Sequence, residues 1–353
     1  MEQSKLIPIL QTPPWKNNPN SIWIATNLKI YRNVNKYLFP GKLDRERQRQ
    51  LSNILQSAVI SLKALNNPSH IFAKELSAAE KHFLFEHFLG VESFHEAHGE
   101  EAFVIDNSGG FLALINVKDH LQLQVTDYKT EIENAWDFLV KIETEIGKSI
   151  DYSFSSRFGF LTSSPKHCGT AFIGTAYLHV PLLVHTNHLS TFLENELNEM
   201  IEAASLQGDL TELIGDLLTL HNKVTIGISE EEIVKMLRIT ATKLMMAEKS
   251  ARTTLKGHEE SLIKNKVSRA YGLLVHSYQI ETVEALNALS LCKLAVDLQW
   301  LKGIDHTLLN ELFFSCRMGH LMSIYPDVLD PEDFSKKRAE IIHKAFKDTN
   351  LLV

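Results

Sequence analysis

A run of polar residues interrupts a strand-like stretch near the middle of the chain. The segment 111–115 is mostly apolar, and apolar residues alternate with glutamine from 121 to 125, at the period of two that is typical of a strand. Between these segments lie Asn116, Lys118, Asp119 and His120, which are an amide, a base, an acid and an imidazole. Because strands rarely carry such a set, the segment is either a turn or a chemical site, and these residues alone favour neither.

Other segments that have the spacing of catalytic motifs lack a required residue. The glycines of 169–175 are spaced as in a P-loop, but Thr175 stands where the phosphate-binding lysine is required. Three histidines at 179, 185 and 188 have no accompanying cysteine or HExxH pattern, so we predict no metal site. No serine lies in a GxSxG elbow and Cys168 has no recognisable partner, which leaves nucleophilic hydrolysis without support.

The elements that must position the polar run can be predicted from apolar periodicity and caps. The helix at 77–89 begins with Ser77 as N-cap and Glu80 at the capping-box position. Asn107-Ser-Gly-Gly110 predicts a hairpin turn between two strands. The other elements predicted in this part are an irregular arm at 1–19, strands at 21–33, 157–161 and 217–226, and helices at 43–64, 129–146, 170–179 and 189–202.

The last third of the chain has a helical pattern throughout. Ser229 as N-cap and Glu232 at the third helical position predict a helix that reaches about residue 255. Helices follow at 258–279, 282–301, 305–324 and 331–347, and the last starts with Asp330 followed by proline. We place a domain boundary near Gly257, which gives an α+β domain at 20–256 and a helical domain at 257–353.

The composition is that of a soluble globular protein. The chain has 353 residues, of which 44% are hydrophobic and 22% charged, a length that suits two domains. Its formal net charge of −7 argues against a nucleic-acid surface. Apolar runs are too short for a membrane span, the first 20 residues do not resemble a signal peptide, and the three cysteines form no framework. We therefore expect a cytoplasmic protein.

Four segments together resemble the guanidino phosphotransferase (phosphagen kinase) family, and within it the bacterial protein-arginine kinase branch. Asn116-Val-Lys-Asp-His-Leu-Gln122 is similar to the family's Asn-Glu-Glu-Asp-His-Leu-Arg, and 158–170 to its Gly-Tyr-Leu-Thr-Ser-Cys-Pro element. The stretches 222–232 and 289–298 extend the likeness, the second into the helical tail of the bacterial branch. The resemblance implies an antiparallel sheet flanked by helices, followed by an all-helical domain.

In the family, five arginines hold the triphosphate of ATP, and the resemblance assigns a different residue to each position here. The replacements are Asn27, Lys29, Gln122, Ile173 and Ala204. Of this nucleotide clamp, Lys29 and the preceding Thr26 are what remains. Cations at such positions neutralise charge that develops during phosphoryl transfer.

The catalytic carboxylates are altered as well. Lys118 stands where the family has a catalytic glutamate, while Asn116, Asp119 and His120 match the rest of that motif. Asp209 keeps a carboxylate at the second catalytic position. We expect the 116–122 segment to face a cleft that it shares with Lys29, Asp209 and the 162–169 loop.

These replacements lead us to predict a protein-arginine-kinase-like pseudokinase that acts by binding partners in stress response or protein quality control, without a cofactor. Losing one charge-stabilising donor costs ~10²–10³ in rate, and a positioned acid or base contributes roughly 10²–10⁴. The alternative is an active kinase that uses Mg-ATP, with Lys29, Lys118 or Lys166 on the phosphates and Asp209 on the guanidinium. A purely structural subunit is a third hypothesis.

The resemblance also implies partners. They are a second copy of the chain, a zinc-binding activator protein and a Clp-type ATPase, with no nucleic acid and no membrane. Arg338 and Ala339 match the end of the Arg-Asp-x-x-Arg-Ala element with which the branch senses phosphoarginine. The resemblance thus makes Arg338 a candidate phosphoarginine-sensing residue.

Overall fold

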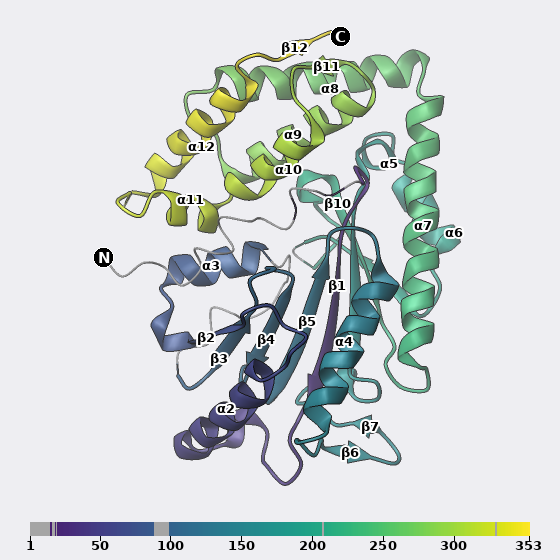
Figure 1. Cartoon of the computed structure of the whole chain (residues 1–353). Coiled ribbons are helices and arrows are strands. Elements are labelled where there is room, and N and C mark those ends of the chain that lie inside the picture. The colour runs from purple at the N-terminus through teal and green to yellow at the C-terminus, as the bar shows by residue number, and fades with distance from the viewer. Residues whose placement is uncertain (1–14, 16–17, 19, 88–98, 207, 329) are drawn as a thin grey trace.

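The computed structural model describes residues 15, 18, 20–87, 99–206, 208–328 and 330–353. The arm predicted at 1–19 lies outside these residues, except for Trp15 and Asn18. In the described part, a large sheet with helices on both faces is followed by a group of helices that packs against one end of the sheet (Figure 1).

The sheet has eight strands in the order β2-β3-β4-β5-β1-β8-β10-β9, and every pairing between neighbours is antiparallel. The strands are β1 (Trp23–Arg32), β2 (Ser69–Phe72), β3 (Ala102–Ile105), β4 (Phe111–Ile115), β5 (Leu121–Asp127), β8 (Phe172–His179), β9 (Ile201–Ala204) and β10 (Leu217–Asn222). A small hairpin, β6 (Phe154–Ser155) and β7 (Gly159–Phe160), lies beside the start of β8. The fold is therefore of the α+β class.

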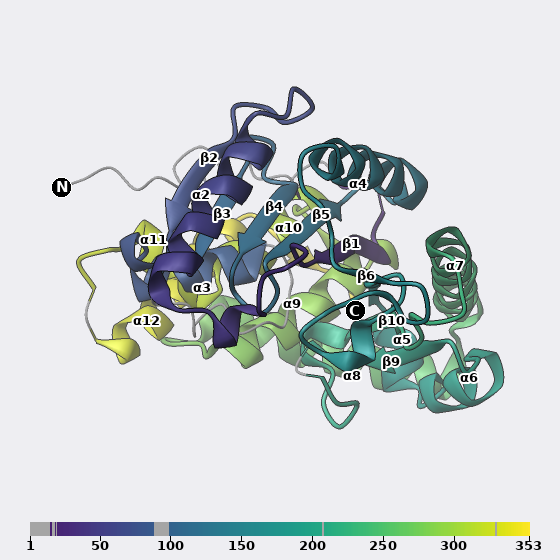
Figure 2. The same cartoon turned by 90° about the horizontal axis from the view of Figure 1, so that it is seen from below.

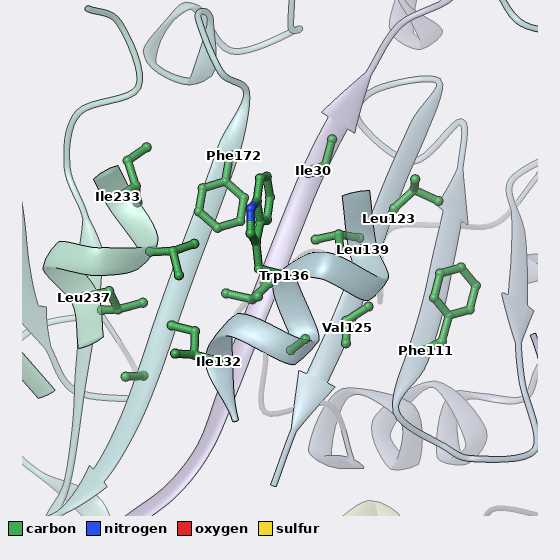
Figure 3. Packing of buried hydrophobic residues seen from close by; sticks show 14 of the residues in the cluster. Ile30, Phe111, Leu123, Val125, Ile132, Trp136, Leu139, Phe172, Ile233 and Leu237 are labelled. Carbon is green, nitrogen blue, oxygen red and sulfur yellow. The ribbon is translucent and has the colours of Figure 1, made fainter. Parts of the chain in front are cut away.

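Three helices cover one face of the sheet and form the main core with it. They are α2 (Arg45–Ile60), α4 (Ile132–Gly147) and α7 (Glu230–Thr254). Apolar residues of α4 at helical spacing meet alternate residues of β1, β5 and β8, and the Trp136 and Phe172 rings lie 4.8 Å apart (Figure 3). Each fully buried side chain of this size contributes about 1.5–3 kcal/mol.

The opposite face is covered at one side by α3 (Ala78–His87), which packs on alternate residues of β2, β3 and β4. In Figure 2 the sheet lies between α2 and α4 on one side and α3 on the other. From β5 to β9, the alternate residues of this face are mostly polar.

The C-terminal helices share a second core. They are α8 (Gly257–His276), α9 (Thr282–Asp297), α10 (His306–Ser315), α11 (Met318–Ile324) and α12 (Pro331–Phe346), with a small pair of strands, β11 (Leu301–Lys302) and β12 (Asn350–Leu351). Leu182 of the short helix α5 (Pro181–His185) and Ile214 belong to the same cluster. Phe314 of α10 stacks on Trp15 at 3.9 Å. The boundary predicted near Gly257 falls between α7 and α8, but side chains from both sides of it share these clusters.

Several predicted elements are confirmed, and three predictions are wrong. Capping boxes start α7 and join Ser77 to Glu80, and Asp330 caps α12. Residues predicted as a helix at 170–179 form strand β8, which pairs with β1 on one side and β10 on the other. The helix predicted at 189–202 ends at Glu196 as α6 (Leu189–Glu196), so that 201–204 can pair with β10 as β9. The helix predicted at 305–324 is divided into α10 and α11.

Candidate functional site

The Asn116–His120 segment is the tight turn that joins β4 to β5. Asn116 adopts a left-handed conformation with φ of 58°, and its backbone N–H donates to the carbonyl of His120. Asparagine tolerates this conformation better than most residues. Its side-chain amide donates to Gln48 O and Ser52 Oγ of α2, each at 2.9 Å. The turn hypothesis is thus correct, and Asn116 fixes the turn to a neighbouring helix.

Asp119 connects the turn to the 162–168 loop. Its carboxylate accepts hydrogen bonds from the Ser163 backbone N–H at 2.6 Å, from Ser163 Oγ at 3.1 Å and from Asn33 Nδ2 at 2.6 Å. Asp119 is 4% exposed, so these donors satisfy a nearly buried charge. The expected proximity of the turn and this loop is confirmed, and in the structure Asp119 acts as an anchor.

His120 anchors the chain that follows β1. Its Nδ1 accepts from the Val34 N–H at 3.0 Å and its Nε2 lies 2.8 Å from the Leu38 carbonyl, which assigns the proton to Nε2. Burial lowers the pKa of His120, with smaller opposing effects from the Leu38 carbonyl and Asp119. A neutral imidazole held on both nitrogens is a structural group in this conformation. By contrast, Lys118 is exposed at the tip of the turn.

All five positions that the resemblance assigned to the arginine clamp lie on one face of the sheet, opposite α2, α4 and α7. Lys29 pairs with Gln124 and Ile173, and Tyr31 pairs with Gln122. Residues paired in an antiparallel sheet point to the same face. The same register carries the face through Asn27, Thr175 and Tyr177 to Thr219 and then to Ala204. We call these residues the polar face.

Gln124 and Thr126, which pairs with Asn27, also lie on the polar face and were not predicted as site residues. Gln124 Nε2 and Thr126 Oγ1 are buried and make no hydrogen bond to any described residue. Gln122 Nε2 lies 3.5 Å from Gln124 Oε1. The alternation of 121–127 carried the signal that could have found them, because it places 122, 124 and 126 on one face.

Thr26 does not belong to the polar face. It points to the helix-covered side, where its hydroxyl accepts a hydrogen bond from the Trp23 indole at 2.9 Å. Successive residues of a strand point to opposite faces, so the prediction that Thr26 and Lys29 share one ligand is wrong.

Asp209 lies at the far edge of the sheet from the turn. It follows β9, which three strands separate from β5, or about 19 Å at the usual strand spacing. Its carboxylate is exposed, and hydrogen bonds from Thr211 lower its pKa. The expectation that Asp209 and Lys118 share one cleft is therefore not met in this conformation.

Arg338 is fully engaged inside the helical part. It is completely buried, and its guanidinium donates to Cys316 O at 2.6 Å, Ile280 O at 2.6 Å and Thr282 Oγ1 at 2.7 Å. These contacts hold α12 against the starts of α9 and α11. In this structure Arg338 presents no donor to a ligand at the surface, contrary to its predicted sensing role.

Nowhere in the described residues do three or more histidine, cysteine or acidic side chains converge as a metal site would require. Each helix in the described part is too short or too polar to cross a membrane.

Comparison with known proteins shows the family. Residues 50–251 match the sequence model described as "ATP:guanido phosphotransferase, C-terminal catalytic domain", and residues 260–351 match "Protein-arginine kinase McsB C-terminal domain". A protein-arginine kinase of Chlamydia pneumoniae is 33% identical over 318 residues, covering 90% of this chain and 88% of that protein. Another, from Halothermothrix orenii, is 28% identical and covers 91% and 92%.

Solved structures agree on the fold. The crystal structure of a lombricine kinase has a TM-score of 0.57 at 16% identity, covering 67% of this chain and 69% of that one. A substrate-free duplicated taurocyamine kinase from Schistosoma mansoni has a TM-score of 0.58 at 18% identity, covering 74% of this chain and 40% of that one.

Proposed function

Because the chain belongs to the ATP:guanido phosphotransferase family, we propose that it is an ATP-dependent protein-arginine kinase, which transfers the γ-phosphoryl group of ATP to an arginine side chain of a protein. The observation that carries this proposal is similarity along most of the chain. The identity of 33% to a protein-arginine kinase covers 90% of the chain, and the match at 260–351 adds the helical part. This favours the active-kinase hypothesis over the pseudokinase that the replaced arginines suggest.

The polar face would hold the triphosphate of Mg-ATP with one charge and several neutral donors. Lys29 supplies the only positive charge among the five clamp positions, and Asn27 and Gln122 supply amide N–H groups. Neutral donors contribute roughly 0.5–1.5 kcal/mol each against about 1.5–3 kcal/mol for charged ones. When bound, Mg²⁺ neutralises charge on the phosphates. The donor chemistry of these residues therefore suits the nucleotide, with weaker binding than an arginine clamp, and Asn27, which is fully buried in this conformation, would have to become accessible to it.

Asp209 would orient the acceptor arginine. A guanidinium presents a planar fork of N–H donors that a carboxylate can accept in pairs. Asp209 follows closely after Ala204, which lies on the polar face, and its lowered pKa keeps it charged at neutral pH. Asp119 and His120 would support the site by fixing the turn and the 162–168 loop.

The identities of four clamp residues favour a second candidate function. Asn27, Gln122, Ile173 and Ala204 are uncharged, and Lys118 would repel a guanidinium. A pseudokinase that binds partner proteins in stress response or protein quality control would need neither charge nor turnover at these positions.

The test is transfer of phosphate from Mg-ATP to arginine in a protein substrate, detected by mass spectrometry. We expect transfer by the wild type and a loss of at least ~100-fold in Lys29→Met and in Asp209→Asn. Glu212→Gln, an exposed acid near Asp209, serves as the matched control and should keep activity. Absence of transfer, together with millimolar or weaker binding of Mg-ATP in calorimetry, would favour the pseudokinase.

We also propose a cytoplasmic homodimer that contacts a zinc-binding activator protein and a Clp-type ATPase. This rests on the resemblance to the bacterial branch. Light scattering after size-exclusion chromatography tests the dimer, and a molar mass of one chain would contradict it.

A further inference from the structure

A small cavity lies where α9 and α10 meet the ends of β1, β8 and β10. Its volume is about 30 Å³, and its walls include Ile24 and Leu217 from the sheet and Leu289 and Phe313 from the helices. A site that holds one water requires about 10–15 Å³. The cavity therefore has room for a small ion or for one or two waters, but not for a nucleotide or a phosphate ester.

Lys293 of α9 lines this cavity. It is 8% exposed, and its ammonium group donates to Asn310 Oδ1 at 2.9 Å. An ammonium has three N–H donors. Within the described residues no carboxylate lies within the 4.0 Å that defines an ion pair with it. A buried cation with a single amide partner is costly unless a counter-charge is close.

The neighbouring carboxylates already have cationic partners. Asp297, one turn further along α9, pairs with Arg252 and lies 2.8 Å from His306 Nε2. Glu248 of α7 also pairs with Arg252, at 2.9 Å. Neither acid therefore forms an ion pair with Lys293, although Asp297 still attracts its charge from a distance.

The polar groups on the sheet side are engaged with one another as well. Asp216 accepts the hydroxyl of Ser290 and faces His185 at 3.3 Å. His179 Nε2 lies 2.7 Å from Ser290 Oγ, and burial holds the pKa of His179 well below its usual value. A neutral His179 supplies no counter-charge.

We propose that this cavity binds one small monovalent anion, such as chloride, beside the ammonium group of Lys293. The anion would accept the two remaining N–H donors and make the site neutral overall. Without it, burial, reinforced by Arg252 and opposed by Asp297, lowers the pKa of Lys293 to about 7. Near neutral pH the anion and a proton would thus enter the cavity together, and they would stabilise the contact between the sheet and the C-terminal helices.

The experiment measures the Tm of the full chain at pH 6.5 and pH 9, at constant ionic strength, as sodium chloride replaces sodium gluconate, whose anion is too large for the cavity. An ion present at ten times its Kd should raise Tm by roughly 2 °C at pH 6.5. The rise should disappear at pH 9, where Lys293 is neutral, and in Lys293→Met at both pH values. Lys264→Met, which removes a half-buried lysine of α8, is the matched control and should keep the response.

A second measurement does not depend on the variant. Crystals grown in bromide at pH 6.5 should show an anomalous peak within hydrogen-bond distance of Lys293 Nζ. Two results would overturn the proposal. One is an equal rise of Tm with chloride in the wild type and in Lys293→Met, and the other is a cavity that contains only water in crystals grown in bromide.

Discussion

Asp119 is the residue on which the geometry of the turn and the 162–168 loop depends. Replacing it with alanine leaves three donors, two from Ser163 and one from Asn33, without their acceptor. We expect Asp119→Ala to lower the free energy of unfolding by roughly 2–4 kcal/mol in urea denaturation, because hydrogen bonds to a charged group are strong and the donors are desolvated. Lys118→Ala, at the exposed neighbouring position, should change it by less than about 0.5 kcal/mol.

Activity measurements on the same pair separate anchoring from chemistry. If Asp119→Ala abolishes phosphoryl transfer while its unfolding free energy stays at the wild-type value, the carboxylate takes part in the reaction and its anchoring role is refuted.

Lys293 gives the stability of the protein a defined dependence on pH. Its pKa is about 7 in the folded chain and 10.5 without the fold. Between these values the unfolded chain holds a proton that the folded chain lacks, so the folded state becomes less stable as the pH falls from 10.5 to 7, by up to about 1.4 kcal/mol per unit. Below pH 7 both states hold the proton and this dependence ends. Urea unfolding in chloride-free buffer should show that the free energy of unfolding rises between pH 7 and pH 10.5, and Lys293→Met should reduce this rise. The same rise in Lys293→Met would show that another group causes it.

At the scale of elements, α3 and α11 form a close joint between the sheet and the C-terminal helices. Glu86 of α3 accepts the backbone N–H groups of Gly319 and His320 and contacts His320 Nδ1 at 2.9 Å. Burial opposes the charge of Glu86, but the His320 hydrogen bond and Arg317 outweigh it and lower its pKa overall. The two helices approach so closely that a Cβ at Gly319 would lie 2.4 Å from Phe83 N.

Gly319→Ala should therefore separate α3 from α11. A clash with backbone atoms has no flexible side chain to relieve it, so we expect a loss of about 1–3 kcal/mol in thermal or urea denaturation. Gly272→Ala is the matched control. Gly272 lies in α8, and a Cβ added there would have no neighbour within 4 Å outside the backbone of the helix, so alanine should stabilise by roughly 0.5–1 kcal/mol. Equal changes in stability for both substitutions would show that α3 and α11 can accommodate a Cβ at position 319 without losing stability.

The sequence predicted elements well where the signal is local. The starts of α7 and α12 follow from Ser229 and Asp330, because a cap needs only residues within one turn. Strand β8 was missed because its stability comes from β1 and β10, which are distant in the sequence. The site shows the same division. The proximity of the Asn116–His120 turn to the 162–168 loop was predicted, and the alternation of the strand predicted at 21–33 already places Thr26 and Lys29 on opposite faces. The anchoring of Asp119 by Asn33 joins segments far apart in the sequence, so no local pattern reveals it.

At the scale of the molecule, side chains from the sheet part and from the C-terminal helices pack together in common clusters. Phe314 of α10 packs with Trp15, Tyr128 and Tyr177, and Leu182 lies in the cluster of the C-terminal helices. We therefore expect one cooperative unfolding transition in calorimetry, with equal calorimetric and van't Hoff enthalpies. Phe314→Ala should lower the midpoint temperature of this single transition and reduce the free energy of unfolding by about 3–5 kcal/mol. Tyr278→Ala, at a side chain that is 78% exposed, should change neither quantity. Two resolved transitions in the wild type would show that the two parts unfold independently.

The low charge of the polar face, where Lys29 is the only charged residue among the five clamp positions, affects how fast any ligand would arrive. Arginines at these positions would create a positive potential that draws a polyanion toward the sheet and speeds its association. Asn27, Gln122 and Ile173 exert almost no force beyond contact distance, so encounter rates should stay near those of an uncharged surface and should hardly change as salt is added. For this chain, ionic strength should govern the encounter with a nucleotide far less than it would with a five-arginine clamp.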